Sequence, residues 1–174
     1  TEGFGVEKEE AYPYLLEQTL MEKGYTQIRV INAGISGSTS ASAVSRLKWY
    51  LRAKPKIMIL ALGANDGLRG LSVENMKKNL GSVIELAQSK NIRILLAGMQ
   101  MPLNYGKSYT DSFKNAYFEL AEQYNTGIIP FLLKDVGAVP EHNLEDGIHP
   151  NQEGHRILTR NVMEHLLPIL ESDN

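Results

Sequence analysis

Residues 56–67 read KIMILALGANDG, and this stretch decides the fold class. Apolar side chains fill nearly every position from 56 to 62, and a loop of small and polar residues follows over residues 63–67. A short, nearly continuous apolar run predicts a strand buried on both faces, as in a parallel sheet that helices cover. Residues 92–99 have the same character and lead into a polar loop over residues 100–110.

Apolar spacing on both sides of this stretch predicts alternating strands and helices. The other expected elements are helices over residues 7–23, 41–53 and 151–170 and strands over residues 27–32 and 127–132. Two further helices are expected to begin at the capping residues Ser72 and Asp111. Because no repeat or linker interrupts the alternation, the sequence predicts a single α/β domain over residues 1–174, with helices on both faces of a parallel sheet.

The composition is that of an ordinary soluble globular protein, with 43% hydrophobic and 22% charged residues. A net charge of −2 gives no reason to expect nucleic acid or an anionic membrane surface as a partner. No apolar run approaches the length of a membrane span, so no stable membrane insertion is expected. The chain has no cysteine, which excludes disulfides, thiolate metal sites and a cysteine nucleophile.

Asp146 and His149 form a candidate catalytic pair within the segment DGIHP of residues 146–150. Gly147 and Pro150 disfavour a continuous helix, and Pro150 favours an extended backbone at His149. Asp146 can then accept a hydrogen bond from one ring nitrogen and leave the other nitrogen free to act as a base. The alternative interpretation is a helix entry, with Asp146 near the cap, Pro150 at the first helical position and His149 incidental.

Small and polar residues from other loops are expected at the same edge of the sheet, because ligands of open α/β sheets bind beyond the carboxyl ends of the strands. The Gly37 N–H and the Asn65 side chain are candidate donors to the oxyanion of an acyl-transfer reaction. Taken singly, Gly34 and Gly37 are explained by a tight turn, and Asn65 by a bond to its own backbone. Their occurrence together with the Asp146–His149 pair favours a site.

These residues fall in segments that resemble a known family. NAGISG at residues 32–37, GANDGLRG at residues 63–70 and DGIHPN at residues 146–151 resemble three of the four sequence blocks of the SGNH (GDSL) hydrolases. The branch of bacterial arylesterases and thioesterase I/lysophospholipase L1 is the most similar, and MPLNYG at residues 101–106 resembles its substrate-side loop. The resemblance spans nearly the whole chain. It implies a flavodoxin-like three-layer α/β/α sandwich, in agreement with the alternation.

The resemblance also implies a role for each matching residue. His149 would be the base, Asp146 would orient it, and Gly37 and Asn65 would be the oxyanion donors. The family's first motif, Gly-Asp-Ser-(Leu), supplies the nucleophile, and its serine is expected two positions before Thr1, on the central first strand of the sheet. Residues 1–174 are therefore expected to be the C-terminal remainder of a longer polypeptide.

The serines of the chain itself are weaker candidates for the nucleophile. GISGS, which contains Ser36 and Ser38, is a near miss to the nucleophile elbow G-x-S-x-G, and that elbow belongs to a different hydrolase fold. We expect these hydroxyls to satisfy the loop backbone and to cap the next helix instead.

The remaining polar candidates receive less specific predictions. Asp66 is expected to anchor its loop. His142 and His155 have no accompanying ligand cluster and are expected to face solvent. Leu103 and Tyr105, together with Tyr109, are candidate substrate-binding residues, although aromatic residues of a surface loop are an alternative interpretation.

The resemblance, together with the candidate site, implies a serine esterase that hydrolyses aryl or short-to-medium acyl esters, with thioesters and lysophospholipids as further candidate substrates. A small-molecule ester is the expected partner, the mechanism requires no cofactor or metal, and the resemblance suggests a periplasmic or secreted protein. One alternative is a carbohydrate acetyl esterase of the same family. Another is a non-catalytic ligand-binding module on a flavodoxin-like sheet, although the loops contain neither G-x-x-x-x-G-K-[ST] nor G-x-G-x-x-G.

Overall fold

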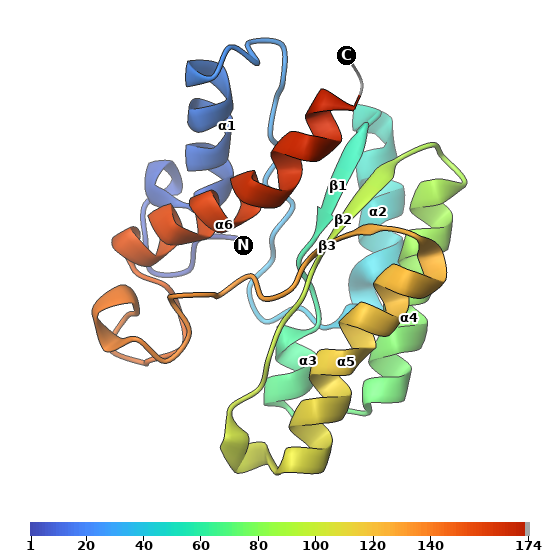
Figure 1. Ribbon diagram of the computed structural model, residues 1–174, viewed down its shortest axis with the longest axis vertical. Coiled ribbons are helices and arrows are strands. Elements are labelled where there is room, and N and C mark those ends of the chain that lie inside the picture. Colours follow the sequence, from blue (N-terminus) through green and yellow to red (C-terminus); the bar gives the residue numbers. More distant parts are fainter. Residues whose placement is uncertain (173–174) are drawn as a thin grey trace. The chain divides into compact units, whose positions relative to one another are not determined.

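The computed structural model describes residues 1–172, which form two compact units (Figure 1). One unit comprises residues 37–132 and contains the sheet, and the other comprises residues 1–36 and 133–172. The predicted α/β class with a parallel sheet is confirmed. The single-domain organisation expected from the sequence stays a prediction.

The sheet has three parallel strands in the order β1-β2-β3. The strands are β1 (Ile57–Leu60), β2 (Arg93–Ala97) and β3 (Gly127–Ile129). Ile57 lies opposite Arg93 in the first pair of strands, and Leu95 lies opposite Gly127 in the second. Each strand falls within a predicted one and is shorter, because the chain leaves the hydrogen-bonded ladder as it enters the loops.

Four α-helices accompany these strands in the sheet unit, α2 (Ala43–Tyr50), α3 (Ala64–Leu68), α4 (Val73–Gln88) and α5 (Lys107–Tyr124). The long helices α4 and α5 pack on β2 and against each other, and α2 packs on α4 (Figure 1). The apolar stripe of each helix faces this packing. The core between them includes Leu80, Ile84, Leu96, Phe113 and Tyr117, each of which is fully buried.

The second unit is built from α1 (Tyr12–Glu22) and α6 (Gln152–Glu171), which pack against each other (Figure 1). Asn151 caps α6, since its side-chain oxygen accepts a hydrogen bond of 3.0 Å from the Gly154 N–H. Short 3-10 helices across the chain lie at Lys8–Glu10, Ser40–Ser42, Leu51–Ala53, Leu103–Tyr105 and Pro140–His142.

The two predicted caps have different outcomes. The Ser72 hydroxyl accepts a hydrogen bond of 3.2 Å from the Asn75 N–H and caps α4, as predicted. The Asp111 cap is wrong, because α5 begins one turn earlier, directly after Gly106, whose φ of 87° turns the chain into the helix. Asp111 lies within the helix and pairs at 2.5 Å with Lys107, one turn before it.

The strand predicted over residues 27–32 is also wrong. A β-strand requires a neighbouring strand that completes its ladder, and no described strand pairs with this segment. A side chain replaces a strand as a partner here, since the Val30 N–H donates a hydrogen bond to the carboxylate of Glu17 on α1. The first helix is likewise shorter than predicted, because the chain forms a separate 3-10 turn at Lys8–Glu10 before α1 begins at Tyr12.

β1 is less buried than its apolar sequence predicts. Leu60 is buried, whereas Ile57, Met58 and Ile59 are only partly buried. β1 lies at the end of the described sheet and has β2 as its one neighbouring strand there. By contrast β2, the middle strand, buries its four positions from Ile94 to Ala97.

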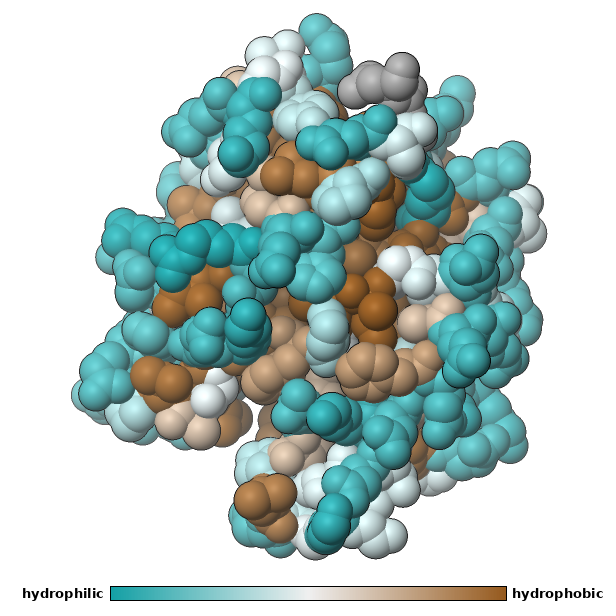
Figure 2. Space-filling view, viewed as in Figure 1, coloured by the Kyte–Doolittle hydropathy of each residue, from teal (hydrophilic) through white to brown (hydrophobic). Residues whose placement is uncertain are grey.

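Some large apolar side chains remain exposed, and Figure 2 shows apolar surface interspersed with polar side chains on one face. Trp49 is 60% exposed, and the Arg52 guanidinium lies 3.7 Å from the centroid of its ring, a cation–π arrangement. Within residues 1–172, every helix is too short or too polar to cross a membrane.

His155 is buried, which corrects the prediction that it faces solvent. It is 2% exposed on the side of α6 that also buries Leu158 and Val162, and its Nδ1 accepts a hydrogen bond of 3.2 Å from the Tyr12 N–H at the start of α1. The neutral ring therefore satisfies one of the free backbone donors at that helix end. Burial lowers the pKa of His155 from 6.5 to about 4.

This pKa shift predicts a loss of stability in mild acid. The unfolded chain takes up the His155 proton below about pH 6.5, whereas the folded protein resists protonation until about pH 4. The free energy of unfolding should therefore decrease over that interval, by up to roughly 3 kcal/mol. Urea unfolding at pH 6.5 and at pH 4 measures this change in stability. A His155→Asn variant keeps a hydrogen-bond acceptor but has no ring to protonate, so its stability should lose most of this dependence on pH. A matched His142→Asn variant should retain it.

Candidate functional site

Asp146 and His149 form a hydrogen-bonded pair in the unit that contains α1 and α6, as the sequence predicts. The distance between Asp146 Oδ2 and His149 Nδ1 is 2.7 Å. Both side chains remain accessible, with exposures of 39% and 38%. With Nδ1 engaged by the carboxylate, the ring nitrogen Nε2 is the one left to exchange a proton with a substrate group.

The backbone around the pair forms a tight turn that fixes Asp146. Its Oδ1 accepts hydrogen bonds of 3.0 Å from both the Ile148 N–H and the His149 N–H. Gly147 takes a φ of 71°, and Leu144 N–H donates to the His149 carbonyl at 2.8 Å, which closes the turn. The helix-entry interpretation fails in one respect, since Asn151 caps α6 and neither Asp146 nor Pro150 belongs to the helix.

These backbone donors determine the charge of Asp146. Hydrogen bonds from the His149 and Ile148 N–H groups, and then from the His149 ring, lower the pKa of Asp146 from 3.8 to about 2. The carboxylate is therefore ionised at any pH near neutrality. An ionised Asp146 is an acceptor only, so it holds the proton of the imidazole on Nδ1 and leaves Nε2 unprotonated in the neutral ring.

Asn65 lies on α3, a short helix where the sequence predicts a loop. Its side chain is partly buried, and the amide has no hydrogen-bond partner among residues 1–172. This removes the simplest alternative, in which the amide bonds its own backbone. The amide thus extends from a helix and is available as a donor to a ligand.

The neighbouring Asp66 anchors α3, as predicted. It is buried, and its two carboxylate oxygens accept from the Ser40 N–H at 2.8 Å and from the Ser40 hydroxyl at 2.6 Å. Asn79 on α4 donates to the same hydroxyl at 3.0 Å. A buried carboxyl group whose two oxygens both accept hydrogen bonds holds its partners firmly, because breaking either bond would leave an oxygen unsatisfied.

Gly37 belongs to the same unit as Asn65, and two contacts tie the loop that carries it to α3. One is the Asp66–Ser40 pair, three residues after Gly37. The other is Arg69, at the end of α3, whose Nη2 donates to the Gly37 carbonyl at 2.8 Å. The segments of the two predicted oxyanion donors are therefore held in a fixed relation. Ser40 and Arg69 were missed by the sequence analysis, although Arg69 lies within the GANDGLRG segment.

Gly34 has a packing explanation. A Cβ atom at this position would lie 2.4 Å from the backbone nitrogen of Glu2, so a larger residue cannot occupy it. The same loop satisfies its backbone through side chains, since the Gly34 N–H donates to Asn32 at 2.9 Å and the Ser36 N–H to the carboxylate of Glu2.

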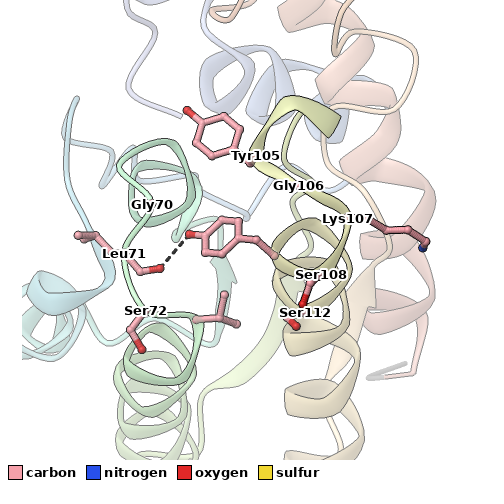
Figure 3. A pocket seen from close by; sticks show the side chains of 10 residues that line it. Gly70, Leu71, Ser72, Tyr105, Gly106, Lys107, Ser108 and Ser112 are labelled. Atoms are coloured by element: carbon pink, nitrogen blue, oxygen red, sulfur yellow. Dashed lines mark hydrogen bonds between the residues drawn. The ribbon is translucent and has the colours of Figure 1, made fainter.

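A shallow pocket of about 600 Å³ opens beside α3, between the start of α4 and the start of α5 (Figure 3). Leu71 lies on one side and Tyr105 on the other, and Tyr109 also lines the pocket. The tyrosine hydroxyls bind the end of α3 and the loop after it, with Tyr105 donating to the Leu68 carbonyl at 2.9 Å and Tyr109 to the Leu71 carbonyl at 2.8 Å. Leu103 is 83% exposed and is not among the lining residues.

The described residues contain no candidate metal-binding site. Within residues 1–172, no group of three or more His, Asp or Glu side chains could hold a metal ion. His142, one of the two histidines considered as ligands, bonds through Nδ1 to the Asp135 carbonyl at 2.7 Å.

Comparison with known proteins finds matches over almost the whole chain. Residues 1–157 match the profile of the GDSL-like lipase/acylhydrolase family. Esterase TesA of Pseudomonas aeruginosa is 38% identical over 169 residues, which cover 97% of this chain and 84% of that protein. An arylesterase of Vibrio mimicus is 34% identical, over 95% of this chain and 82% of its own length.

Two further comparisons extend these matches. Thioesterase 1/protease 1/lysophospholipase L1 of Escherichia coli is 30% identical over 99% of this chain and 81% of its own length. The crystal structure of TesA superposes with a TM-score of 0.92 at 37% identity, covering 96% of this chain and 93% of that one.

Proposed function

Since the chain belongs to the GDSL-like lipase/acylhydrolase family, it is a carboxylic ester hydrolase, and we propose that Asp146 and His149 supply its catalytic base. The observation that carries the proposal is the 2.7 Å hydrogen bond between the Asp146 carboxylate and His149 Nδ1. An imidazole held in this way has Nε2 free as a proton acceptor, which a serine nucleophile requires.

The proposed reaction begins with the serine of the Gly-Asp-Ser segment expected before Thr1. Its hydroxyl oxygen attacks the ester carbonyl carbon while the proton passes to His149 Nε2. The Asn65 amide, the Gly37 N–H and the N–H of the serine itself donate to the oxyanion that forms. The Asp66–Ser40 contact and the Arg69–Gly37 bond support this role, since they fix the segments of both donors before substrate arrives.

The same imidazole completes the reaction. His149 gives its proton to the oxygen of the departing alcohol, which leaves an acyl-serine ester. A water molecule then loses a proton to His149 and attacks that ester, and the second oxyanion collapses to the free acid and the regenerated serine. Asp146 stabilises the imidazolium that exists at both stages.

We propose aryl esters and short-to-medium acyl esters as the substrates. The names of the relatives, an arylesterase and a thioesterase 1/lysophospholipase L1, support this class and add thioesters and lysophospholipids to it. The pocket beside α3, lined by Leu71, Tyr105 and Tyr109, is proposed to receive part of the substrate. Leu103 is proposed to contact the substrate only at the rim, because it is almost fully exposed.

Labelling with a fluorophosphonate tests the function. The protein is expressed from its complete reading frame, treated with the probe, and the modified peptide is mapped by mass spectrometry. We expect the label on a serine two positions before Thr1, together with loss of hydrolysis of phenyl acetate. A label on Ser36 or Ser38 would overturn the choice of nucleophile, and a folded protein that neither reacts nor hydrolyses the ester would overturn the proposal.

Replacing Asn65 by alanine is expected to lower kcat by roughly a hundred- to a thousandfold, because one oxyanion donor is lost. The free energy of unfolding should hardly change, since the amide has no described partner to lose. Steady-state kinetics on phenyl acetate and urea unfolding measure the two quantities. Asn75→Ala, an exposed position on α4, is a matched control that should retain normal turnover. Near-normal kcat in Asn65→Ala would contradict the assigned role.

A further inference from the structure

Phe4 is held against the ring of His149 by an unusual turn. Gly3 and Gly5 on either side of it have φ values of 97° and 76°, which favour glycine. A Cβ atom on Gly3 would lie 2.7 Å from the Cβ of Ala11, so the turn is pressed against the start of α1. The Val6 N–H closes it by donating to the Gly3 carbonyl at 3.2 Å. The side chain between the two glycines is thereby fixed in direction.

That side chain lies on the imidazole. The centroids of the Phe4 and His149 rings are 4.5 Å apart, and the ring planes are tilted by 39°. Phe4 is nevertheless 52% exposed, and the neighbouring Ile148 is 49% exposed. An aromatic ring left half in water has no evident role in the core, because much of its apolar surface is not removed from solvent.

We propose that Phe4 is a specificity-determining residue that contacts the alcohol portion of the ester and favours aromatic alcohols. This inference rests on the proposed function. As the general acid, His149 must bring Nε2 within hydrogen-bond reach of the departing oxygen, so the alcohol passes directly beside the imidazole. The Phe4 ring is in contact with that imidazole, so its exposed surface borders the path of the alcohol.

Phe4 is not needed to orient His149, because other groups already do so. Asp146 holds the ring through Nδ1 at 2.7 Å and is itself fixed by two backbone N–H groups at 3.0 Å. Phe4 adds no hydrogen bond to this arrangement. Its distinct contribution is a flat apolar surface, and an aromatic substrate ring gains from such a surface through offset or edge-to-face packing.

Three esters can show whether Phe4 contacts the alcohol portion or the acyl portion of the substrate. Benzyl acetate carries an aromatic alcohol, ethyl phenylacetate carries an aromatic acyl group, and ethyl acetate carries neither. Both alcohols are primary, so protonation of the leaving group is comparable. Replacing Phe4 by leucine should lower kcat/KM for benzyl acetate by about tenfold. The values for the two ethyl esters should change much less, and Phe4→Tyr should restore the preference.

Tyr14→Leu is the matched control, because Tyr14 is an exposed aromatic residue on α1 in the same unit, 39% accessible. It should leave all three esters unaffected. An equal loss for all three esters in Phe4→Leu would overturn the inference in favour of a positioning role, and a selective loss for ethyl phenylacetate would place Phe4 on the acyl side. No change would also overturn it. Fluorophosphonate labelling of the wild type separates failure of this inference from failure of the esterase function.

Discussion

Replacing His149 by alanine is expected to reduce kcat by roughly a millionfold, the loss that follows when a serine hydrolase loses its catalytic base. Without the ring nitrogen Nε2, the nucleophilic serine has no acceptor for its proton, and the departing alcohol has no donor. The side chain is partly exposed and forms no part of the core, so the fold should survive. Hydrolysis of phenyl acetate and urea unfolding measure the two effects.

His142→Ala provides the matched control for this variant. His142 lies in the same unit, is also partly exposed, and also bonds through Nδ1 to a nearby oxygen, at 2.7 Å. It should retain full turnover. If His149→Ala remained active within an order of magnitude while folded, the assignment of the base would be wrong, whatever serine the fluorophosphonate labels.

Replacing Asp146 by asparagine is expected to lower kcat by roughly ten-thousandfold, less than the loss of His149. The amide has nearly the same shape and can still accept from the Ile148 and His149 N–H groups through its oxygen. Its NH₂ group would then face His149 Nδ1, which must become the acceptor. The ring proton moves to Nε2, and the base is no longer available.

The control for Asp146→Asn is Glu145→Gln, which removes the charge of the adjacent exposed carboxylate. It should have little effect on turnover, because the expected defect comes from the tautomer of His149 and not from the local charge. Equal losses in the two variants would point to an electrostatic effect instead. Since the pKa of Asp146 is lowered to about 2, its protonation cannot explain any loss of wild-type activity near neutral pH.

The parallel α/β fold followed from local patterns. The apolar runs at residues 56–62, 92–99 and 127–132 each contain a strand, and the fold is shared with the solved structure of TesA. Residues 27–32 have equally good β-branched content, but a strand depends on a partner that the local sequence does not specify. The start of α5 was misplaced because backbone geometry at Gly106, rather than the Asp111 side chain, begins the helix.

The candidate site was predictable where one short segment contains the chemistry. Asp146 and His149 are three residues apart, and their hydrogen bond follows from a single turn. Contacts between distant segments were not predictable, such as Ser40 with Asp66 or Phe4 with His149. His155 could have been placed in the core, since it lies three residues before Leu158 and seven before Val162, on one helical face.

The position of β1 at the end of the sheet also bears on solubility. Within residues 1–172 one side of β1 pairs with β2, and no strand pairs with the other side. Its residues, Ile57 to Leu60, are all apolar and include no charge that would discourage pairing. Wherever this edge is uncovered, its free N–H and carbonyl groups offer a template to a strand of another molecule.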